Sequence, residues 1–546
     1  MTSLFVQSVT TNIGPPNGIA FRSEGADGGN NGSGADGTNL SVTTDDTVVI
    51  HATGGASGIY VSSTGGNSFD VSQGHGGIAG DVTVSNAGVV TTTGVNAYGI
   101  LARSIGGNGR PNNQDDGALG APGGVVTVTN AGTASITTTN DGAAGIYAFS
   151  SSGHTTNSST YGIGVGTVTV TNNGSIETSG TSSLTDPLSF AHGIVAVNIA
   201  GSGSDGKNEN RLGSASGGNA GLGGDASAVT VTTTDSITTH GNGSYGIYAQ
   251  SQGGFGGTGG AAGERGSTNT GGGYGAAGGV GGAVTVTASG SVATTADADA
   301  IGIFANSVGG RGGNGGSATG GTAVGRDGGT GGTGGAVTVT MDGSVVVKTH
   351  GSTSYGIYAL SQGDVGGVGG DASDSLTVDG TSGNGGIGGA GGQVTIADNG
   401  VGVRSVTTDG VNAIGIFGES LGGRGGDGAN ALGSFNANAR NGADGGAAGG
   451  VTIDTTANVT TSGAGAFGLF AYSQGGDSGN GGHAFSLTNA NAGNSHNAGA
   501  GGAVSLTSSG TVTTGGANAV ALYALSAGGN GGNGNSGDAF NAAGGN

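Results

Sequence analysis

The stretch VVTVTNAGTASITTTNDGAAGIYAFS, from Val125 to Ser150, determines the fold that we predict for the whole chain. It holds three short runs, VTVT, SITTT and GIYA, separated by Gly, Asn and Asp residues that favour turns. Each run is rich in β-branched or aromatic residues and alternates between inward and outward types, which is the two-residue period of a strand. The stretch therefore predicts three short β-strands in succession.

The third run recurs along the chain as a small residue, Ile or Leu, usually an aromatic, Ala, a variable residue and Ser. Its copies begin at Gly18, Gly58, Gly99, Gly145, Gly193, Gly246, Gly302, Gly356, Gly415, Gly468 and Ala521. Successive copies lie between 40 and 59 residues apart, which indicates a fixed core with insertions of varying length. A repeated unit of three strands is typical of one coil of a parallel β-helix. We therefore predict an all-β fold, with residues 1–546 forming a single repetitive β-solenoid of about eleven coils.

Strand alternation also predicts which side chains fill the solenoid. In VTVT the valines face inward and the threonines face outward. In the third run Ile, Ala and Ser face inward, and stacked coils align them in columns: Ile247, Ile303 and Ile357; Ala249, Ala305 and Ala359; Ser251, Ser307 and Ser361. By the same parity the aromatic column faces outward: Tyr248, Phe304 and Tyr358. The freely varying position also faces outward: Phe149, Gln250, Asn306, Leu360 and Glu419.

Composition agrees with a repeat protein and limits its partners. The chain has 137 Gly, 33% hydrophobic residues and 4% aromatics, too few large apolar side chains for a conventional globular core of 546 residues. A net charge of −21 argues against binding to nucleic acid or to anionic membranes. There is no Cys, which excludes disulfides and thiolate metal sites, and no apolar run long enough to insert directly into a membrane.

The insertions follow the Ser of each motif copy and are dominated by glycine. Residues 252–282 are more than half Gly, and triplets such as GGRGGNGG from Gly309 and GGIGGAGG from Gly385 are common. A three-residue Gly period is typical of polyproline-II-like segments, because Gly lets backbones approach closely. We expect these arms to fold back over the outward aromatic column. The alternative is that they are flexible loops, since ordering Gly has the largest entropic cost.

One segment resembles a nucleotide-binding loop. The sequence GSGSDGKN, from Gly201 to Asn208, fits GxGxxG and the start of a phosphate-binding loop. However, Asn208 occupies the position where Ser or Thr would bind magnesium, and no helix is predicted to follow. With so many glycines a chance match is expected, and we predict no nucleotide site.

Histidines and carboxylates do not predict a metal or catalytic centre either. His240 and His350 each lie six residues before a GIY motif, so they are copies of one position two coils apart, about 10 Å. That separation is too large for a shared zinc ion with bonds of about 2 Å.

The acidic pairs are scattered along the chain: Asp45 with Asp46, Asp115 with Asp116, and Asp297 with Asp299. We place most basic residues singly in the Gly arms, as for Arg103, Arg311 and Arg424. GGRGGDGAN at Gly422 resembles a calcium-binding repeat but does not recur in tandem. We therefore predict that the protein is not an enzyme and has no catalytic, cofactor-binding or metal-binding residues.

The two ends of the chain fall within repeats. SVTTNIGPPNGIAF, from Ser8, resembles SITTTNDGAAGIYAF, from Ser135, and the chain closes in a Gly-rich segment. Free-standing solenoids usually carry caps, and no capping element is recognisable here. We expect the chain to be part of a longer protein.

The succession of VTVTNAG, SITTT and GIYAQSQGGFGGTGG resembles the passenger regions of large autotransporters of Gram-negative bacteria, and the resemblance covers nearly the whole chain. It implies a right-handed parallel β-helix displayed on the cell surface, often acting in adhesion. It also implies an outer-membrane anchor in a region not in this chain. The ligand could be a glycan, a host protein, a mineral surface or a second copy of the chain.

Two other functions are compatible with the sequence. Outward threonines such as Thr285 and Thr287, or Thr338 and Thr340, would stack into a regular array that resembles those of β-solenoid proteins that bind ice. Some β-helix proteins are polysaccharide lyases or hydrolases built on paired carboxylates, and the acidic pairs leave that alternative open.

Overall fold

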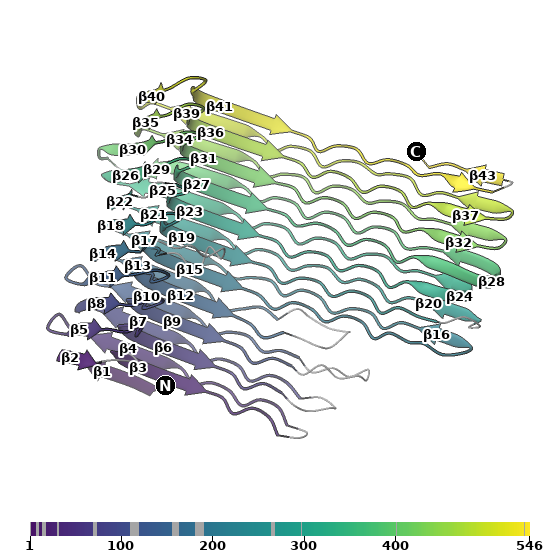
Figure 1. The fold of residues 1–546 in the computed structure, drawn as a ribbon, viewed down its shortest axis with the longest axis horizontal. Coiled ribbons are helices and arrows are strands. Elements are labelled where there is room, and N and C mark those ends of the chain that lie inside the picture. The colour runs from purple at the N-terminus through teal and green to yellow at the C-terminus, as the bar shows by residue number, and fades with distance from the viewer. Residues whose placement is uncertain are drawn as a thin grey trace.

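The computed structural model describes residues 2–6, 10–13, 18–29, 32–68, 74–109, 119–154, 163–180, 191–263, 268–295, 298–399, 401–539 and 541–545. Three parallel sheets, A, B and C, each have 11 strands, and a fourth sheet, D, has 10. Every coil contributes one strand to each of the first three sheets in turn, which makes a parallel β-solenoid (Figure 1). In the part of the chain that the structure describes there is no helix, and thus none that could span a membrane.

The strands of sheet A are β1 (Thr2–Val6), β4 (Leu40–Thr44), β7 (Val82–Asn86), β10 (Val126–Asn130), β13 (Val168–Asn172), β17 (Val229–Thr233), β21 (Val284–Ala288), β25 (Val337–Asp342), β29 (Val394–Asn399), β34 (Val451–Thr455) and β39 (Val504–Ser508). Those of sheet B are β2 (Thr10–Ile13), β5 (Val49–Ala52), β8 (Val89–Thr93), β11 (Ser135–Thr139), β14 (Ser175–Ser179), β18 (Ile237–His240), β22 (Ser291–Thr294), β26 (Val345–His350), β30 (Arg404–Asp409), β35 (Asn458–Ser462) and β40 (Val512–Gly515).

Sheet C holds β3 (Ile19–Glu24), β6 (Ile59–Thr64), β9 (Ile100–Ile105), β12 (Ile146–Ser151), β15 (Ile194–Ile199), β19 (Tyr245–Gln252), β23 (Ile301–Val308), β27 (Tyr355–Gln362), β31 (Ile414–Leu421), β36 (Phe467–Gln474) and β41 (Val520–Ala527). Sheet D holds β16 (Ser214–Ser216), β20 (Asn269–Gly271), β24 (Ala318–Val324), β28 (Ala372–Thr381), β32 (Ala431–Gly433), β33 (Asn436–Asn438), β37 (Ala484–Ser486), β38 (Asn489–Asn491), β42 (Gly537–Asp538) and β43 (Asn541–Ala543). Each of the recurring third-run motifs falls on a strand of sheet C.

The solenoid core is built from the residues that alternation predicts to face inward. Val284 and Val286 of β21 are fully buried, whereas Thr285 and Thr287 between them are half-buried on the outer side. In β23, Ile303, Ala305 and Ser307 are all fully buried, and the first two belong to one continuous apolar core that runs through the coils. The predicted inward columns of sheet C are therefore confirmed.

The outward columns of sheet C are in register but more covered than the sequence suggests. Tyr248, Phe304 and Tyr358 are neighbours across β19, β23 and β27, as predicted. Asn306 lies on the same side of the sheet, between Gln250 and Leu360, yet it is only 8% exposed. Alternation predicts which face a residue occupies, but not how far its neighbours on that face cover it.

Polar groups inside the solenoid are paired in columns. The buried amide of Asn86 donates to the Oδ1 of Asn130 at 2.9 Å, and Asn130 donates to Asn172 at 2.8 Å. The turn between sheets B and C uses left-handed backbone, with φ of 126° at Gly94 and 57° at Asn96. Gly and Asn tolerate this conformation best, which explains their recurrence at this turn.

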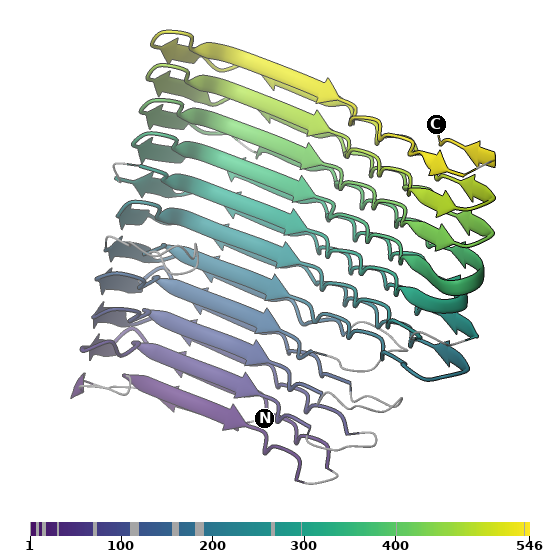
Figure 2. The ribbon, with the colours of Figure 1, turned by 45° about the vertical axis from the view of Figure 1, so that its right-hand side comes forward.

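The glycine arms do not fold back over the aromatic column, so that expectation is wrong. Each arm leaves the end of a sheet C strand and continues away from the solenoid, and from β15 onward the arms reach sheet D before they return (Figures 1 and 2). We call residues 309–316 an outbound arm and residues 325–335 a return arm, and use the same terms in the other coils. The stacked arms form two layers, which we call the slab.

Backbone hydrogen bonds recur every third residue in the slab. Gly309 donates to Gln362 at the end of β27, and Gly312 and Gly315 donate to Val365 and Val368 of the next outbound arm, over 2.8–2.9 Å. Gly310, Gly313 and Gly316 donate to the preceding return arm, at Gly279, Ala276 and Gly273, over 2.8 Å. This is the three-residue period of a polyproline-II helix, and the hydrogen bonds contradict the flexible-loop alternative for the described arms.

Close approach of backbones explains why the first two positions of each triplet are Gly. A Cβ atom on Gly309 would overlap the carbonyl oxygen of Gly332, and one on Gly310 would overlap that of Gly254. Both obstacles are backbone atoms of neighbouring arms, which cannot rotate away as side chains do. The arms of the slab can therefore pack this closely only because these positions carry no side chain.

The inward serine at the end of each third-run motif joins the arm to the solenoid. Ser307 Oγ donates to the carbonyl of Gly282 at 2.8 Å and accepts the N–H of Gly335 at 2.8 Å. Ser361 repeats both hydrogen bonds one coil later, with Gly335 and Gly392. These contacts hold the end of each return arm against sheet C, which accounts for a buried hydroxyl at this position.

Sheet D closes the far edge of the slab with a small core of its own. Ala431 and Ala484 are buried in β32 and β37, and Ala437 and Ala490 are buried in β33 and β38. The buried side chains of this cluster are therefore alanine methyl groups. We call this part of the molecule the tip.

Candidate binding surface

The third residue of each Gly-Gly-X triplet points out of the slab. Arg311 is exposed and Asn314 and Ser317 are half-buried, while the glycines between them are mostly buried. Equivalent residues of successive coils stand in columns, because Gly256, Gly312 and Gly366 donate in turn to the carbonyls of Arg311, Val365 and Arg424. The outer face of the outbound layer is thus a lattice of side chains.

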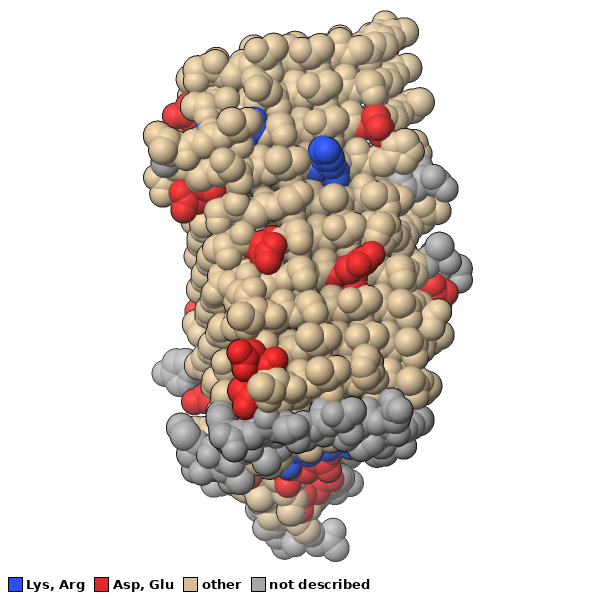
Figure 3. Space-filling model, turned by 90° about the vertical axis from the view of Figure 1, so that its left-hand side faces the viewer, with Lys and Arg blue, Asp and Glu red and all other residues tan. Residues whose placement is uncertain are grey.

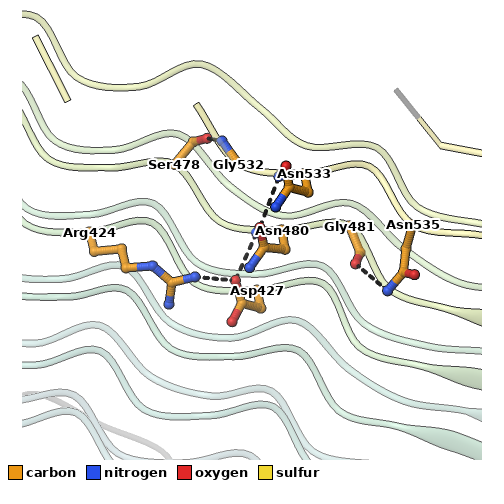
Figure 4. Close-up of polar contacts among 8 residues, drawn as sticks. All are labelled: Arg424, Asp427, Ser478, Asn480, Gly481, Gly532, Asn533 and Asn535. Carbon is orange, nitrogen blue, oxygen red and sulfur yellow. Dashed lines mark hydrogen bonds and ion pairs between the residues drawn. The ribbon is translucent and has the colours of Figure 1, made fainter. Parts of the chain in front are cut away.

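Asp and Asn in these columns bind the backbone of the next coil. Asp427 Oδ1 accepts the N–H of Asn480 at 2.7 Å, and Asn480 Oδ1 accepts that of Asn533 at 2.8 Å (Figure 4). Arg424 also forms an ion pair with Asp427, at 2.5 Å. Where the preceding coil carries Asp or Asn at this outward position, its carboxylate or amide accepts the outward N–H, which the backbones of the neighbouring arms do not bind. This role was not predicted from the sequence, although the 53-residue spacing of Asp427, Asn480 and Asn533 equals the local repeat step.

A shallow hollow opens at the base of the outbound face. Its walls include Phe255, Arg311, Asn314 and Asp364, and its volume is about 350 Å³. Burial raises the pKa of Asp364, while the N–H of Val365 and the charge of Arg311 act in the opposite direction. The hollow offers a cation, a carboxylate and an exposed aromatic ring within one small area.

Sheet A presents a second ordered surface. Its outward threonines align across strands, as Thr230, Thr285 and Thr338 do in β17, β21 and β25. The column extends in both directions: Thr83, Thr127, Thr169, Thr230, Thr285, Thr338, Thr395 and Thr452. A parallel column follows two residues later: Thr129, Thr171, Thr232, Thr287 and Thr340. Rungs are about 4.8 Å apart and the two columns about 6.6 Å.

The aromatic column of sheet C is a stack of rings. Centroids lie 5.3 Å apart between Tyr248 and Phe304, and 4.8 Å between Tyr358 and Phe417. Tyr358 donates to the Oε2 of Glu419 at 2.5 Å. Burial raises the pKa of both groups, most strongly for Tyr358, whose phenol also faces the charge of Glu419. Because the rings cover one another, this column stabilises the outer side of sheet C.

Charged side chains are sparse on the solenoid. Figure 3 faces the side that carries sheet B and shows scattered acidic and basic residues within a mostly neutral surface. His240 and His350 belong to this sheet and occupy the same column, two coils apart, as the sequence predicts. His240 contacts Thr295 and Glu177, and His350 contacts Asp409. Among the described residues no group of three His, Asp or Glu could hold a metal ion.

The segment from Gly201 to Asn208 is an outbound arm. Gly203 and Gly206 donate to Phe255 and Thr258 of the next coil at 2.7 Å, and Asn208 Oδ1 accepts the N–H of Ala261 at 2.7 Å. The backbone donors that would hold a phosphate are bound to the next arm instead.

The acidic pairs and basic residues lie apart from one another. Asp45 accepts the N–H of Thr47 at 3.0 Å in the turn that it shares with Asp46, and Asp299 accepts the hydroxyl of Thr353. Asp115, Asp116 and Asp297 lie outside the described residues. Arg311 and Arg424 are in outbound arms as predicted.

The placement of Arg103 in a Gly arm is wrong. It lies in β9, with its guanidinium 5.4 Å from the ring centre of Tyr60 and its Nε donating to Ser62 at 2.9 Å. Its position follows the Ala of the third-run motif, which is the variable outward position of sheet C. The motif itself could have placed it on the strand.

Comparison with protein-family models, with curated proteins and with solved structures finds no match for this chain.

Proposed function

We propose that this chain is a rigid structural or adhesive element of a bacterial cell surface, of the autotransporter passenger type, and that it is not an enzyme. The observation that carries the proposal is the lattice of outward side chains on the slab, in which the same backbone position recurs from coil to coil. A surface of this kind suits many weak contacts whose combined strength comes from their number.

The finer features of the solenoid and its location belong to the same proposal. About eleven coils are supported by the three 11-stranded sheets, and a right-handed winding follows from the strong preference of parallel strand connections. Display outside a Gram-negative cell, with an anchor elsewhere in a longer protein, would expose the slab to ligands. The net charge of −21 favours a partner other than nucleic acid.

Surface display tests the adhesive role. The chain is displayed on a bacterium that neither aggregates nor attaches, with its level at the surface verified, and both properties are scored. We expect attachment or aggregation to increase, and to fall steeply when copies of the repeat are removed, because avidity depends on their number. Unchanged aggregation and attachment would leave a passive stalk as the function.

A second candidate function is binding to ice or to another crystalline surface. The in-register columns of Thr230, Thr285 and Thr338 and of Thr232, Thr287 and Thr340 favour it, because they repeat hydroxyls and methyls at constant spacing. Thermal hysteresis of the purified chain is the test, with Thr285→Lys combined with Thr338→Lys as the variant. Activity that the variant lacks would support this function, and no hysteresis in the unmodified chain would remove it.

A further inference from the structure

The tip carries a cleft that differs from the rest of the slab. It has a volume of about 480 Å³ and is lined by Asp371, Ala372, Ser373, Asn430, Ala431, Leu432, His483 and Phe485. These residues come from the first positions of β28, β32 and β37, and from the residue before each of them. The three strands stack side by side at the far edge of the slab (Figures 1 and 2).

Two columns of opposite character form the walls. Leu432 and Phe485 are paired in register and are 43% and 47% exposed, which makes an apolar wall. Asp371, Asn430 and His483, each of which immediately precedes its strand, make a polar wall. Between the walls the buried alanines Ala372, Ala431 and Ala484 point into the tip, so the floor is backbone and the cleft stays open.

Hydrogen bonds between neighbouring coils position the polar wall, and these bonds leave some of its polar atoms available for a ligand. Asp371 Oδ1 accepts the N–H of Asn430, and Asn430 Oδ1 accepts that of His483, each at 2.9 Å. These bonds fix the two side chains along the column. The second carboxylate oxygen of Asp371 and the amide nitrogen of Asn430 are not used by them. His483 Nε2 lies 3.2 Å from Asp538 of the next coil, which sets the direction of its ring.

We propose that this cleft binds a neutral saccharide chain, with the sugar's C–H face on Phe485 and Leu432 and its hydroxyls on Asp371, Asn430 and His483. The proposal rests on the adhesive function and names its ligand class. A pyranose ring has one apolar face and an edge of hydroxyls, which matches one apolar and one polar wall across a concave floor. Acidic saccharides fit poorly, because Asp371 lines the cleft, Asp538 lies against His483 and the chain carries a net charge of −21.

Binding of defined oligosaccharides to the purified full chain tests the proposal. The probes are neutral oligomers of hexoses and of N-acetylhexosamines, with a uronic acid oligomer as the charged comparison, measured by calorimetry. We expect at least one neutral oligomer to bind and the uronic acid oligomer to bind more weakly or not at all.

The variants are Phe485→Ala, His483→Ala and, as the matched control, Phe435→Ala. Phe435 is 55% exposed on the same tip but lies outside the cleft. We expect Phe485→Ala to weaken binding roughly tenfold and His483→Ala about fivefold, with Phe435→Ala unchanged. All three side chains are at least partly exposed, so equal melting temperatures will verify that each variant folds.

No binding of any neutral oligomer, equal loss in Phe485→Ala and Phe435→Ala, or preference for the uronic acid oligomer would overturn the proposal. The adhesion assay distinguishes a failure of the proposed adhesive function from a failure of the proposed saccharide binding. If Phe485→Ala abolishes oligosaccharide binding but displayed cells still attach, the cleft binds sugar and adhesion uses other columns. If the unmodified chain attaches but binds no neutral oligomer, the adhesive function stands and this inference fails.

Discussion

The solenoid and the slab are two parts of one chain that are stabilised in opposite ways. The solenoid buries side chains such as Ile303 and Val286 in a continuous apolar core. The slab has almost no side chains to bury, and each pair of glycines, such as Gly309 and Gly310, bonds its N–H groups to two neighbouring arms. In the first case hydrophobic burial offsets the entropy of ordering, and in the second a dense network of backbone hydrogen bonds must do so. Substitutions should therefore act differently in the two regions.

The largest effect should come from a charge in the solenoid core. Ile303→Asp removes an apolar side chain and buries a carboxylate without a partner, so we expect the free energy of unfolding to fall by at least about 3 kcal/mol. Chemical denaturation measures it. Thr287→Asp, on the outer side of β21, should be close to neutral, and Asn306→Asp should fall between them because Asn306 is buried on the outer face. Equal losses at Ile303 and Thr287 would contradict the assignment of faces.

In the slab, the substitution with the largest expected effect adds a side chain at a closely packed glycine. Gly310→Val would overlap the carbonyl of Gly254 and separate adjacent arms, at a cost of about 2–3 kcal/mol. Arg311→Val is the matched control, because the next coil carries Val365 at that outward position and the change should have little effect. If both substitutions had the same effect on stability, the close packing of the arms would not depend on glycine at position 310.

The junction between the two regions should respond less strongly. Ser307→Ala removes one hydrogen bond to Gly282 and one from Gly335, which should lower the free energy of unfolding by about 1–2 kcal/mol. Ser317→Ala, which removes a single exposed contact with Asp371, serves as the control. If both serines proved equally dispensable, the arms would not depend on this junction.

The smallest predicted effect depends on pH and concerns the outer side of sheet C. Burial raises the pKa of Glu419, and the hydrogen bond from Tyr358 opposes that change. Because the folded protein favours the protonated acid, its stability should decrease as pH rises from the ordinary Glu pKa of about 4.3 through the raised value. Glu419→Gln keeps an acceptor for Tyr358 but carries no charge.

Melting temperatures of the variant and the unmodified chain, compared across pH, test this. The variant should melt higher above the raised pKa of Glu419, and the difference should vanish as pH falls below 4.3, the ordinary Glu value. A difference that does not change with pH would show that the charge of Glu419 is not the cause.

The sequence predicts the structure of the solenoid better than that of the slab. In the solenoid, alternation places Ile303, Ala305 and Ser307 inside and Thr285 outside, because each strand has two faces and its side chains differ between them. In the slab, glycine has no side chain that marks a face, so the triplet period indicates the conformation of the arms but not their direction. Sheet D was not predicted, since its strands are short and its core is alanine.

The binding surface was also only partly predictable. The threonine columns of sheet A follow from alternation and register. The binding of Asn480 by Asp427, and the two walls of the tip cleft, depend on which coil lies next to which. Only the stack brings residues about 53 positions apart into contact.

Residue-resolved hydrogen exchange tests the central claim, that the glycine arms are an ordered, hydrogen-bonded slab. Gly309 and Gly310 donate to neighbouring arms and should exchange slowly, as the amides of β23 do, whereas the outward N–H of Arg311 should exchange fast. The N–H of Asn480, bound by Asp427, should be slower than that of Arg311. A three-residue alternation of slow, slow and fast amides is the predicted result. Uniformly fast exchange through residues 309–316, at the rate of a free peptide, would contradict it.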